Sequence, residues 1–391
     1  MKQYIHATIA STIAWAGNIY DLLLLTYVYP ELMRAFSLNY LLISVLFALG
    51  LIGRVIGGFA FGKYADSIGR KPVLLLGTGG YAAFQGVLAF SPNALLLFAS
   101  RFLEGVFMGA QWTAGTVIAY EQAPQSMKGV VTGIVQTGYG IGYALTGVTY
   151  LAFLPTIEES WRYFLLVGSL PLLVVPYAHL KVKESKVTST GTAKVKYKDY
   201  LPVLIRATAG MSGMFVAYFC FFGNYETVEE KFFGISPSTV GEILTVANVV
   251  LALSFLLFGR LADYVGKSRL IYAGLVTLTV STPFAIPLFL PHDSLSVLIG
   301  TSVYSFSDGF WPLMPLLIAE AVPMEVRGAL AGLSYNIGGL VGGLADVALG
   351  VVDSLYGLSA LVNAMFALQF VAILVVFVSV ITWPKSGTRV A

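Results

Sequence analysis

A short polar stretch between two long apolar runs constrains this chain more than any other feature. The run before it, residues 40–61, contains one charged residue, Arg54, and the run after it, residues 72–90, contains none. A helix of about 20 apolar residues crosses the hydrocarbon core of a bilayer, which is about 30 Å thick. The pattern therefore predicts that residues 62–71 form a tight hairpin between two membrane-spanning helices.

Five residues of this hairpin have roles that follow from their chemistry and spacing. Gly62 and Asp66 lie four apart on one helix face, so a second helix can approach at the glycine and present its positive N-terminus to the carboxylate. Gly69 permits the turn. Arg70 and Lys71 favour the cytoplasmic side of a membrane. We therefore expect a helix-to-helix contact at the cytoplasmic surface.

The hairpin recurs in the second half of the chain. Gly259, Asp263 and Gly266 repeat the spacing of four and three residues, 197 positions later. A second pair of segments, residues 121–129 and 320–328, is related by an offset of 199. Because both offsets are close to half of the 391 residues, the sequence predicts two copies of one unit, in the same orientation and with an even number of spans each.

The composition supports a membrane protein and argues against an enzyme. The chain is 57% hydrophobic and 11% charged, whereas a soluble domain carries about 25% charged residues. Its 41 glycines suit tight helix packing in lipid. Cys220 is the only cysteine, so no intramolecular disulfide can form. The sequence contains no phosphate-binding loop, metal-ligand cluster or nucleophile–histidine pair, and we expect neither enzymatic activity nor a cofactor or metal.

Hydropathy predicts an all-α protein of twelve spans. They lie at residues 8–33, 39–62, 72–90, 93–120, 128–153, 161–180, 201–225, 236–261, 268–290, 295–321, 328–352 and 357–383. Residues 1–180 would form an N-terminal six-helix bundle and residues 201–391 a C-terminal one, joined by a polar cytoplasmic linker at 181–200.

The distribution of basic residues predicts the orientation. An even number of spans puts both termini on one side, and 18 of the 23 Lys and Arg residues fall on that side. The positive-inside rule makes it the cytoplasmic side of a plasma membrane. We expect a monomer whose partners are the bilayer, protons and a small-molecule substrate, and no nucleic acid.

The hairpin resembles the signature loop of the major facilitator superfamily, and both copies of it are present. Further motifs are similar to the sialate:proton symporter branch, which includes the fungal lactate and pyruvate permeases. They are Arg101 with Glu104 and Gly105, Gln111–Trp112, Glu121 with Pro124, Gln136 with Gly138 and Tyr139, Glu325 with Arg327 and Gly328, and residues 334–338. The resemblance implies two six-helix bundles that expose a central site alternately to each side of the membrane.

In that superfamily the repeated loops hold the cytoplasmic ends together when the cavity opens outward. The resemblance assigns this gate to Gly62, Asp66, Gly69, Arg70, Lys71, Glu121, Gly259, Asp263, Gly266, Arg269, Glu320 and Arg327. Helix-terminus contacts of this kind contribute about 0.3–2 kcal/mol each. The alternative is that these charges only set the topology.

Charged residues inside spans are the candidates for chemistry, because they are costly in lipid. Asp21 lies near the middle of the first span, where the symporter branch often carries two acids three apart; here Asn18 replaces the first. Burial disfavours the charged carboxylate, so Asp21 is a candidate proton carrier. The alternative is a structural pair with Arg54.

Arg101 and Glu104 lie three apart on the fourth span, and Gln111 lies two turns further on the same face. Relatives commonly carry the amide and the acid in the opposite order, which makes Glu104 the local replacement for their coupling residue. Either Arg101 and Glu104 simply pair, or a substrate anion competes with Glu104 for the arginine. The planar guanidinium suits bidentate contact with a carboxylate.

Asp308 is the candidate acid of the second half, in the middle of the tenth span. It would serve as a second protonation site or as a cavity wall, or else form a local hydrogen bond. Asp346 and Asp353 are expected at a solvated mouth. Three more acids crowd the outer end of the seventh span: Glu226, Glu229 and Glu230. The polar His-and-Asp motif of the lactate permeases has no secure match there.

Neutral polar and aromatic residues on spans one, four, five, seven, ten and eleven are candidates to line the substrate site. They are Asn18, Tyr20, Gln111, Trp112, Gln136, Tyr139, Asn224, Trp311, Tyr335 and Asn336. Each alone can equally be a packing residue. Relatives often carry an arginine where Gly339 stands, so the substrate here either differs or binds through Arg101.

The sequence therefore predicts a proton-coupled importer of a small organic anion, a monocarboxylate. A carrier for a sugar or another neutral solute, or an exporter, is the alternative within transport, although the fifth span lacks the Gly-Pro pair typical of antiporters. A membrane sensor that binds without translocation is a further alternative. Uptake into liposomes separates a sensor from a transporter.

Overall fold

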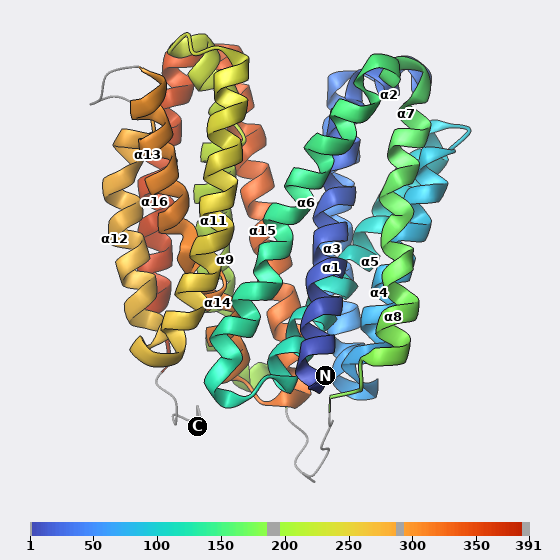
Figure 1. The fold of residues 1–391 in the computed structure, drawn as a ribbon, viewed down its shortest axis with the longest axis vertical. Helices are drawn as coiled ribbons and strands as arrows, with labels where there is room; N and C mark the ends of the chain where they lie inside the picture. The colour runs from blue at the N-terminus through green and yellow to red at the C-terminus, as the bar shows by residue number, and fades with distance from the viewer. Residues whose placement is uncertain (1, 186–195, 287–292, 385–391) are drawn as a thin grey trace. The chain divides into compact units, whose positions relative to one another are not determined.

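The computed structural model describes residues 2–185, 196–286 and 293–384, and these form a helical protein in which no strand is found. Its first eight α-helices are α1 (Gln3–Tyr27), α2 (Tyr29–Phe36), α3 (Tyr40–Ile68), α4 (Arg70–Ala89), α5 (Ala94–Gln122), α6 (Lys128–Phe153), α7 (Ile157–Leu166) and α8 (Val174–Lys181). The others are α9 (Leu201–Phe222), α10 (Tyr225–Thr227), α11 (Pro237–Val265), α12 (Lys267–Ala285), α13 (Ser294–Ser307), α14 (Leu313–Ala321), α15 (Met324–Tyr356) and α16 (Leu358–Ile381) (Figure 1).

The twelve predicted spans are confirmed as helical, with interruptions that hydropathy does not reveal. Nine helical stretches of the described residues are individually long and apolar enough to cross a membrane. The sixth span is α7 and α8 joined through a 3-10 segment, Val167–Leu173, and the tenth is broken at Asp308–Phe310. The first span ends at Tyr27 rather than residue 33, because α2 begins as a separate helix with a proline in its first turn.

Contacts between Cα atoms divide the chain into two compact units, which are described separately below. The first unit is Met1–Gln125, Ile134–Tyr197 and Val322–Asn336, and the second is Ser126–Gly133, Lys198–Ala321 and Ile337–Ala391. Helices α6 and α15 thus each contribute residues to both units. The division into six-helix bundles at the linker stays a prediction, and residues 186–195 of that linker lie outside the described residues.

Glycines bring α3 and α5 into close contact in the first unit. A Cβ atom at Gly53 would collide with the carbonyl oxygen of Phe102, and one at Gly57 with the carbonyl oxygen of Val106. Gly105 on α5 packs in turn against the backbone of Gly50. This spacing allows backbone-to-backbone packing, as expected for helices in lipid.

The second unit is packed mainly through aromatic side chains. Phe221 of α9 stacks on Tyr304 of α13 with ring centroids 3.8 Å apart. Phe310, in the break of the tenth span, covers Gly274 of α12. Among the described aspartate, glutamate, lysine and arginine residues of this unit, the buried ones are two acids, Glu229 and Asp308.

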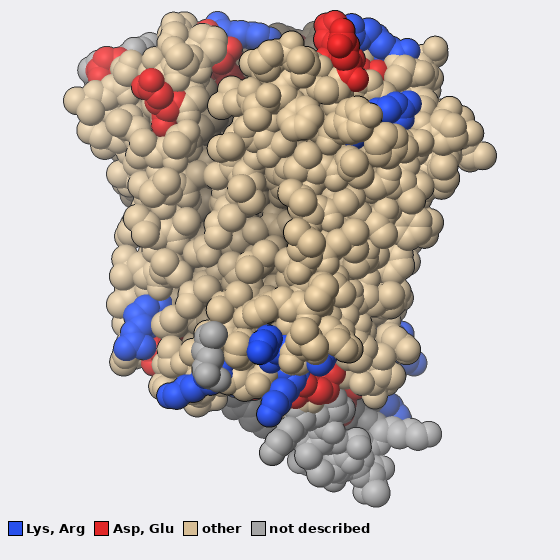
Figure 2. All heavy atoms as spheres, turned by 45° about the vertical axis from the view of Figure 1, so that its right-hand side comes forward, with Lys and Arg blue, Asp and Glu red and all other residues tan. Residues whose placement is uncertain are grey.

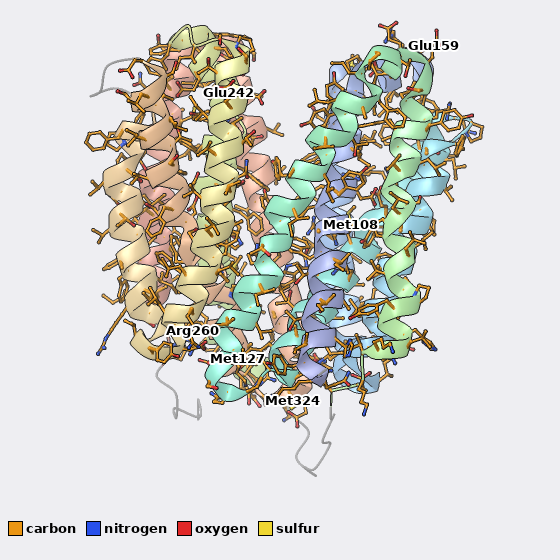
Figure 3. All side chains as sticks on the ribbon, viewed as in Figure 1. Met108, Met127, Glu159, Glu242, Arg260 and Met324 are labelled. Carbon is orange, nitrogen blue, oxygen red and sulfur yellow. The ribbon has the colours of Figure 1, made fainter. Side chains whose placement is uncertain are left out.

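Charged side chains concentrate at the ends of the helices. On the face drawn in Figure 2 the blue and red residues gather at the two ends, and a band without charges lies between them. Figure 3 shows the same arrangement along α11, which carries Glu242 near its start and Arg260 near its end. The uncharged surface between these ends is therefore what would face hydrocarbon.

Candidate functional site

A fully buried ion pair lies on α5 in the first unit. The Nη1 atom of Arg101 lies 3.0 Å from Oε1 of Glu104, and neither side chain is exposed to solvent. The three-residue spacing puts both groups on one face of the helix, which explains why they meet. Nε and Nη2 of Arg101 and Oε2 of Glu104 have no hydrogen-bond partner among the described residues. The pair is thus only partly satisfied.

Asp21 of α1 joins this pair. Its carboxyl group lies close enough to Glu104 and Arg101 to interact electrostatically with both. Neither oxygen of Asp21 receives a hydrogen bond from a described donor, and Oδ1 lies against Gly168. The three side chains therefore form a buried cluster that can hold a proton between two acids.

The alternative prediction, a pair between Asp21 and Arg54, is wrong. The Nε atom of Arg54 instead donates to Oδ1 of Asn336 at 3.4 Å, and its guanidinium lies 5.5 Å from the ring of Trp15. Arg54 is within electrostatic range of both Arg101 and Glu104. Arg54 and Asp21 thus each interact electrostatically with the pair of Arg101 and Glu104.

An aromatic cluster that includes Trp15 lies beside Arg54. Trp112 stacks on Tyr335 with ring centroids 3.5 Å apart and an angle of 18° between the planes. Trp15 meets Tyr335 edge-on at 6.0 Å, and Tyr139 lies 6.5 Å from Trp15. The structure therefore brings together three predicted site residues, Trp112, Tyr139 and Tyr335, and one that was not predicted, Trp15. They come from helices α5, α6, α15 and α1, respectively.

Amides form a second polar layer beside the cluster. Asn18 donates from Nδ2 to Oε1 of Gln111 at 2.7 Å and to the carbonyl oxygen of Met108 at 2.9 Å. Figure 3 labels Met108 midway along α5. Gln111 lies two turns after Glu104 on α5, and its side chain bonds to Asn18. Of the other candidates, Tyr20 bonds to Thr149 at 2.9 Å and Gln136 is buried on α6.

The predicted site residues of the second unit make local contacts, and the backbone N–H of Trp311 donates to the carbonyl oxygen of Asp308 at 2.9 Å. Asn224 donates to Oδ1 of Asp346 at 2.8 Å. Trp311 packs edge-on against Phe215 with centroids 4.9 Å apart. Asp308 is buried in the helical break, and its Oδ2 has no partner among the described residues.

Glu229, one of the three acids that the sequence places at the outer end of the seventh span, is completely buried. It sits in a π-helical turn, Val228–Phe232, and neither carboxylate oxygen has a described hydrogen-bond partner. A π turn holds an extra residue per turn, so it rotates following side chains away from the face that a regular helix predicts. Hydropathy gives no signal for such a turn.

The first hairpin makes the helix-terminus contact that its spacing predicts. Asp66 accepts hydrogen bonds from the backbone N–H groups of Gly328 at 2.8 Å and Ala329 at 2.9 Å, in the first turns of α15. Gly62 packs directly on Ala329. Arg70 bonds to Asp66 at 2.5 Å and to the carbonyl oxygen of Met324 at 2.6 Å. Figure 3 labels Met324 where α15 begins.

Other predicted gate residues complete this contact. Glu121 accepts from Arg327 at 2.9 Å and lies 3.4 Å from Arg70. Gly69 has a φ of +113°, which favours glycine, and Lys71 donates to the carbonyl oxygen of His179 at 2.7 Å. We call Asp66, Arg70, Glu121 and Arg327 the first latch.

The second hairpin makes the equivalent contact inside the second unit. Asp263 accepts from the N–H groups of Gly129 at 2.8 Å and Val130 at 3.3 Å, and Gly259 packs on Gly129. Gly266 has a φ of +98°. Glu320 pairs with Lys267 at 2.9 Å, whereas Arg269 is exposed and makes no ion pair among the described residues. Lys267 therefore takes the place that the sequence suggested for Arg269.

The comparisons with known proteins agree with this architecture. A sequence profile described as the Major Facilitator Superfamily matches residues 8–345. The sialic acid transporter NanX of Escherichia coli (strain K12) is 26% identical over 363 residues, covering 88% of this chain and 87% of NanX. A probable 4-methylmuconolactone transporter of Cupriavidus pinatubonensis is 25% identical, over 92% of this chain and 85% of that protein. The cis,cis-muconate transport protein of Acinetobacter baylyi is 23% identical, over 85% of this chain and 84% of its own.

Solved structures share the fold at low sequence identity. The proton:xylose symporter XylE, bound to 6-bromo-6-deoxy-D-glucose, superposes with a TM-score of 0.80 at 16% identity, covering 98% of this chain and 96% of XylE. The human organic anion transporter MFSD10 gives a TM-score of 0.75 at 15% identity, covering 96% and 100%. At this identity the likeness establishes the fold alone.

Proposed function

Because the chain belongs to the major facilitator superfamily and is thus a multi-pass membrane transporter rather than an enzyme, we propose that it couples the uptake of a small organic anion, a monocarboxylate, to protons. The observation that carries this proposal is the buried cluster of Asp21, Arg101 and Glu104. The two carboxyl groups, beside an arginine, can bind one proton between them. Binding or release of this proton changes the net charge of the cluster by one.

The nature of the substrate is supported by the relatives and by the charges of the first unit. The relatives named above are transporters of sialic acid, 4-methylmuconolactone and cis,cis-muconate. Two buried arginines, Arg54 and Arg101, suit an anionic substrate better than a neutral one. The neutral candidates of the sequence analysis would line the rest of the substrate site.

The charges of the buried residues explain how substrate binding would be coupled to proton binding. With one proton on the Asp21–Glu104 pair, the two acids and the arginines Arg54 and Arg101 carry a net charge of about +1, and a bound monocarboxylate neutralises it. Without that proton the same anion would leave an excess negative charge in a buried place, which is costly. Substrate and proton therefore each favour the binding of the other, and a coupling of about 1–3 kcal/mol corresponds to about 5–150-fold in affinity.

The first latch and the equivalent contact of the second hairpin, Asp263 with Gly129, which we call the second latch, supply the conformational step of the proposal. Asp66 and Asp263 each hold the first turn of a helix from another part of the chain, α15 and α6 respectively. Release of several such contacts shifts a two-state equilibrium by a few kcal/mol. We place the latches at the cytoplasmic ends of the two halves, with both termini in the cytoplasm, as the positive-inside rule predicts. Asp308 is a further candidate protonation site.

The test is uptake by purified protein in liposomes with an imposed pH gradient, acidic outside. Labelled benzoate, lactate, sialic acid and glucose form the panel. Accumulation of an acid should require the gradient, and Asp21→Asn and Glu104→Gln should abolish accumulation while sparing exchange of labelled for unlabelled acid. Glu159→Gln, at an exposed acid on α7, is the control. Unchanged accumulation in both cluster variants, or gradient-independent uptake of glucose alone, would refute the proposal.

A further inference from the structure

Arg54 differs from the other buried arginines of the described residues. Arg70 pairs with Asp66 at 2.5 Å and Arg101 pairs with Glu104 at 3.0 Å. Arg54, with 6% of its surface exposed, makes no ion pair among the described residues; its hydrogen bond goes to the neutral side chain of Asn336. A buried cation is costly without a counter-charge, so Arg54 has the electrostatics of an anion-binding group.

Two consecutive residues of α15 occupy the space beside Arg54. The ring of Tyr335 stacks on Trp112 at 3.5 Å, and the side-chain amide oxygen Oδ1 of Asn336 accepts from Nε of Arg54 at 3.4 Å. An aromatic ring on an indole and a carbonyl oxygen on a guanidinium are the two contacts that an aromatic carboxylate would make. The side chains of Tyr335 and Asn336 thus make the same two contacts that an aromatic carboxylate would make.

The hydrogen-bonding groups left over around this place are mostly donors. The indole Nε1 atoms of Trp15 and Trp112 are buried with no described acceptor. The amide hydrogens of Asn18 already bond to Gln111 and Met108, which leaves the buried Oδ1 of Asn18 as an acceptor without a described partner. A carboxylate only accepts hydrogen bonds and suits such a set. A substrate rich in hydroxyls brings donors that would stay unsatisfied, at about 1–3 kcal/mol each.

We propose that Arg54 binds the carboxylate of the substrate, that Trp112 stacks on a flat aromatic or conjugated body, and that Tyr335 and Asn336 hold this place until the substrate displaces them. That the bound ligand is also transported rests on the proposed function. It assigns the substrate contact to Arg54 rather than Arg101. Arg101 has no exposed surface and is already paired with Glu104.

The proposal is tested by measuring equilibrium binding to the purified protein by titration calorimetry, in detergent and at fixed pH. The probes are benzoate, its neutral analogue benzamide, the non-planar cyclohexanecarboxylate, and the hydroxyl-rich gluconate. Benzoate should bind about tenfold or more tightly than each of the others, since a site that loses a charged or polar contact discriminates by at least that factor. Because no membrane or pH gradient is present, a failure of proton coupling would leave this result unchanged.

Two sets of variants should change binding in opposite directions. Arg54→Gln should remove the preference for benzoate over benzamide, and Arg54→Lys should restore part of it. Tyr335→Ala combined with Asn336→Ala should tighten benzoate binding several-fold, because the competing groups are gone. Arg34→Gln and Tyr356→Ala, at exposed positions of α2 and α15, are the matched controls. Ratios between probes within one variant are independent of the fraction of folded protein.

Three results would overturn the proposal. The first is benzoate binding no tighter than benzamide, or not at all, in the unmodified protein. The second is an Arg54→Gln variant that keeps the benzoate preference. The third is weaker benzoate binding by the Tyr335 and Asn336 double variant, which would make these residues substrate contacts instead of competitors.

Discussion

The carboxylate of Glu184 caps helix α4 by accepting a hydrogen bond from the backbone N–H of Arg70 at 2.7 Å. The same carboxylate also accepts from the N–H of Lys71 at 3.0 Å, and Gly69 leaves the room that its oxygens occupy. The first N–H groups of a helix have no partner within the helix, and a negative side chain there is favoured by the helix dipole. The segment after α8 thus fastens the hairpin that carries the first latch. At the second hairpin, no atom of the described residues lies within 4 Å of the position that a Cβ atom at Gly266 would take.

Glu184→Ala should destabilise the first unit by about 0.5–2 kcal/mol, which is the usual range for the loss of an N-terminal cap. Both N–H groups of α4 would then depend on water. A lowered midpoint of thermal unfolding in detergent is the expected readout. Glu158→Ala, at an exposed acid whose one ion pair is long, is the control. Equal midpoints for the two variants would mean that the cap contributes nothing.

Gly57→Ala should destabilise the packing of α3 on α5, because the added Cβ would collide with the carbonyl oxygen of Val106. Overpacking of this kind costs about 1–3 kcal/mol, and backbone atoms cannot move aside as flexible side chains do. Gly147→Ala on α6 is the matched control, since nothing lies within 4 Å of its added methyl group. The control should be neutral or slightly stabilising, as alanine favours helices. Equal unfolding midpoints in the two variants would contradict the close approach of α3 and α5.

Local spacing made the hairpin contacts predictable. Gly62 and Asp66 share a helix face whatever the rest of the fold does, so a contact with a helix N-terminus follows from the sequence alone. The partner of Arg54 did not follow, because Asn336 is 282 residues away and depends on how α15 packs. Glu184 was missed for the same reason. The burial of Glu229 depends on a π turn that leaves no sequence pattern.

Local spacing also explains which contacts of the cluster of Asp21, Arg101 and Glu104 could be predicted from the sequence. Arg101 and Glu104 lie three apart on one helix, so their pairing was one of the two outcomes that the sequence allowed. That Asp21 meets this pair instead of Arg54 depends on the rotation of α1 against α5, which hydropathy does not specify because α1 is buried on most of its surface.

The two acids of this cluster should respond differently to neutralisation. Glu104→Gln removes the one carboxylate paired with Arg101, and breaking a buried ion pair from one side costs about 3–5 kcal/mol. Asp21 receives no described hydrogen bond, so Asp21→Asn removes a buried charge that has no donor and should cost less than about 1 kcal/mol or even stabilise the protein. Thermal unfolding of both variants in detergent at one pH gives the comparison. The double variant adds a further check, because residues in contact deviate from additivity by about 0.5–3 kcal/mol. If Asp21→Asn were the more destabilising change, or if the two effects simply added, the acids would not share a proton and the cluster would be two independent sites.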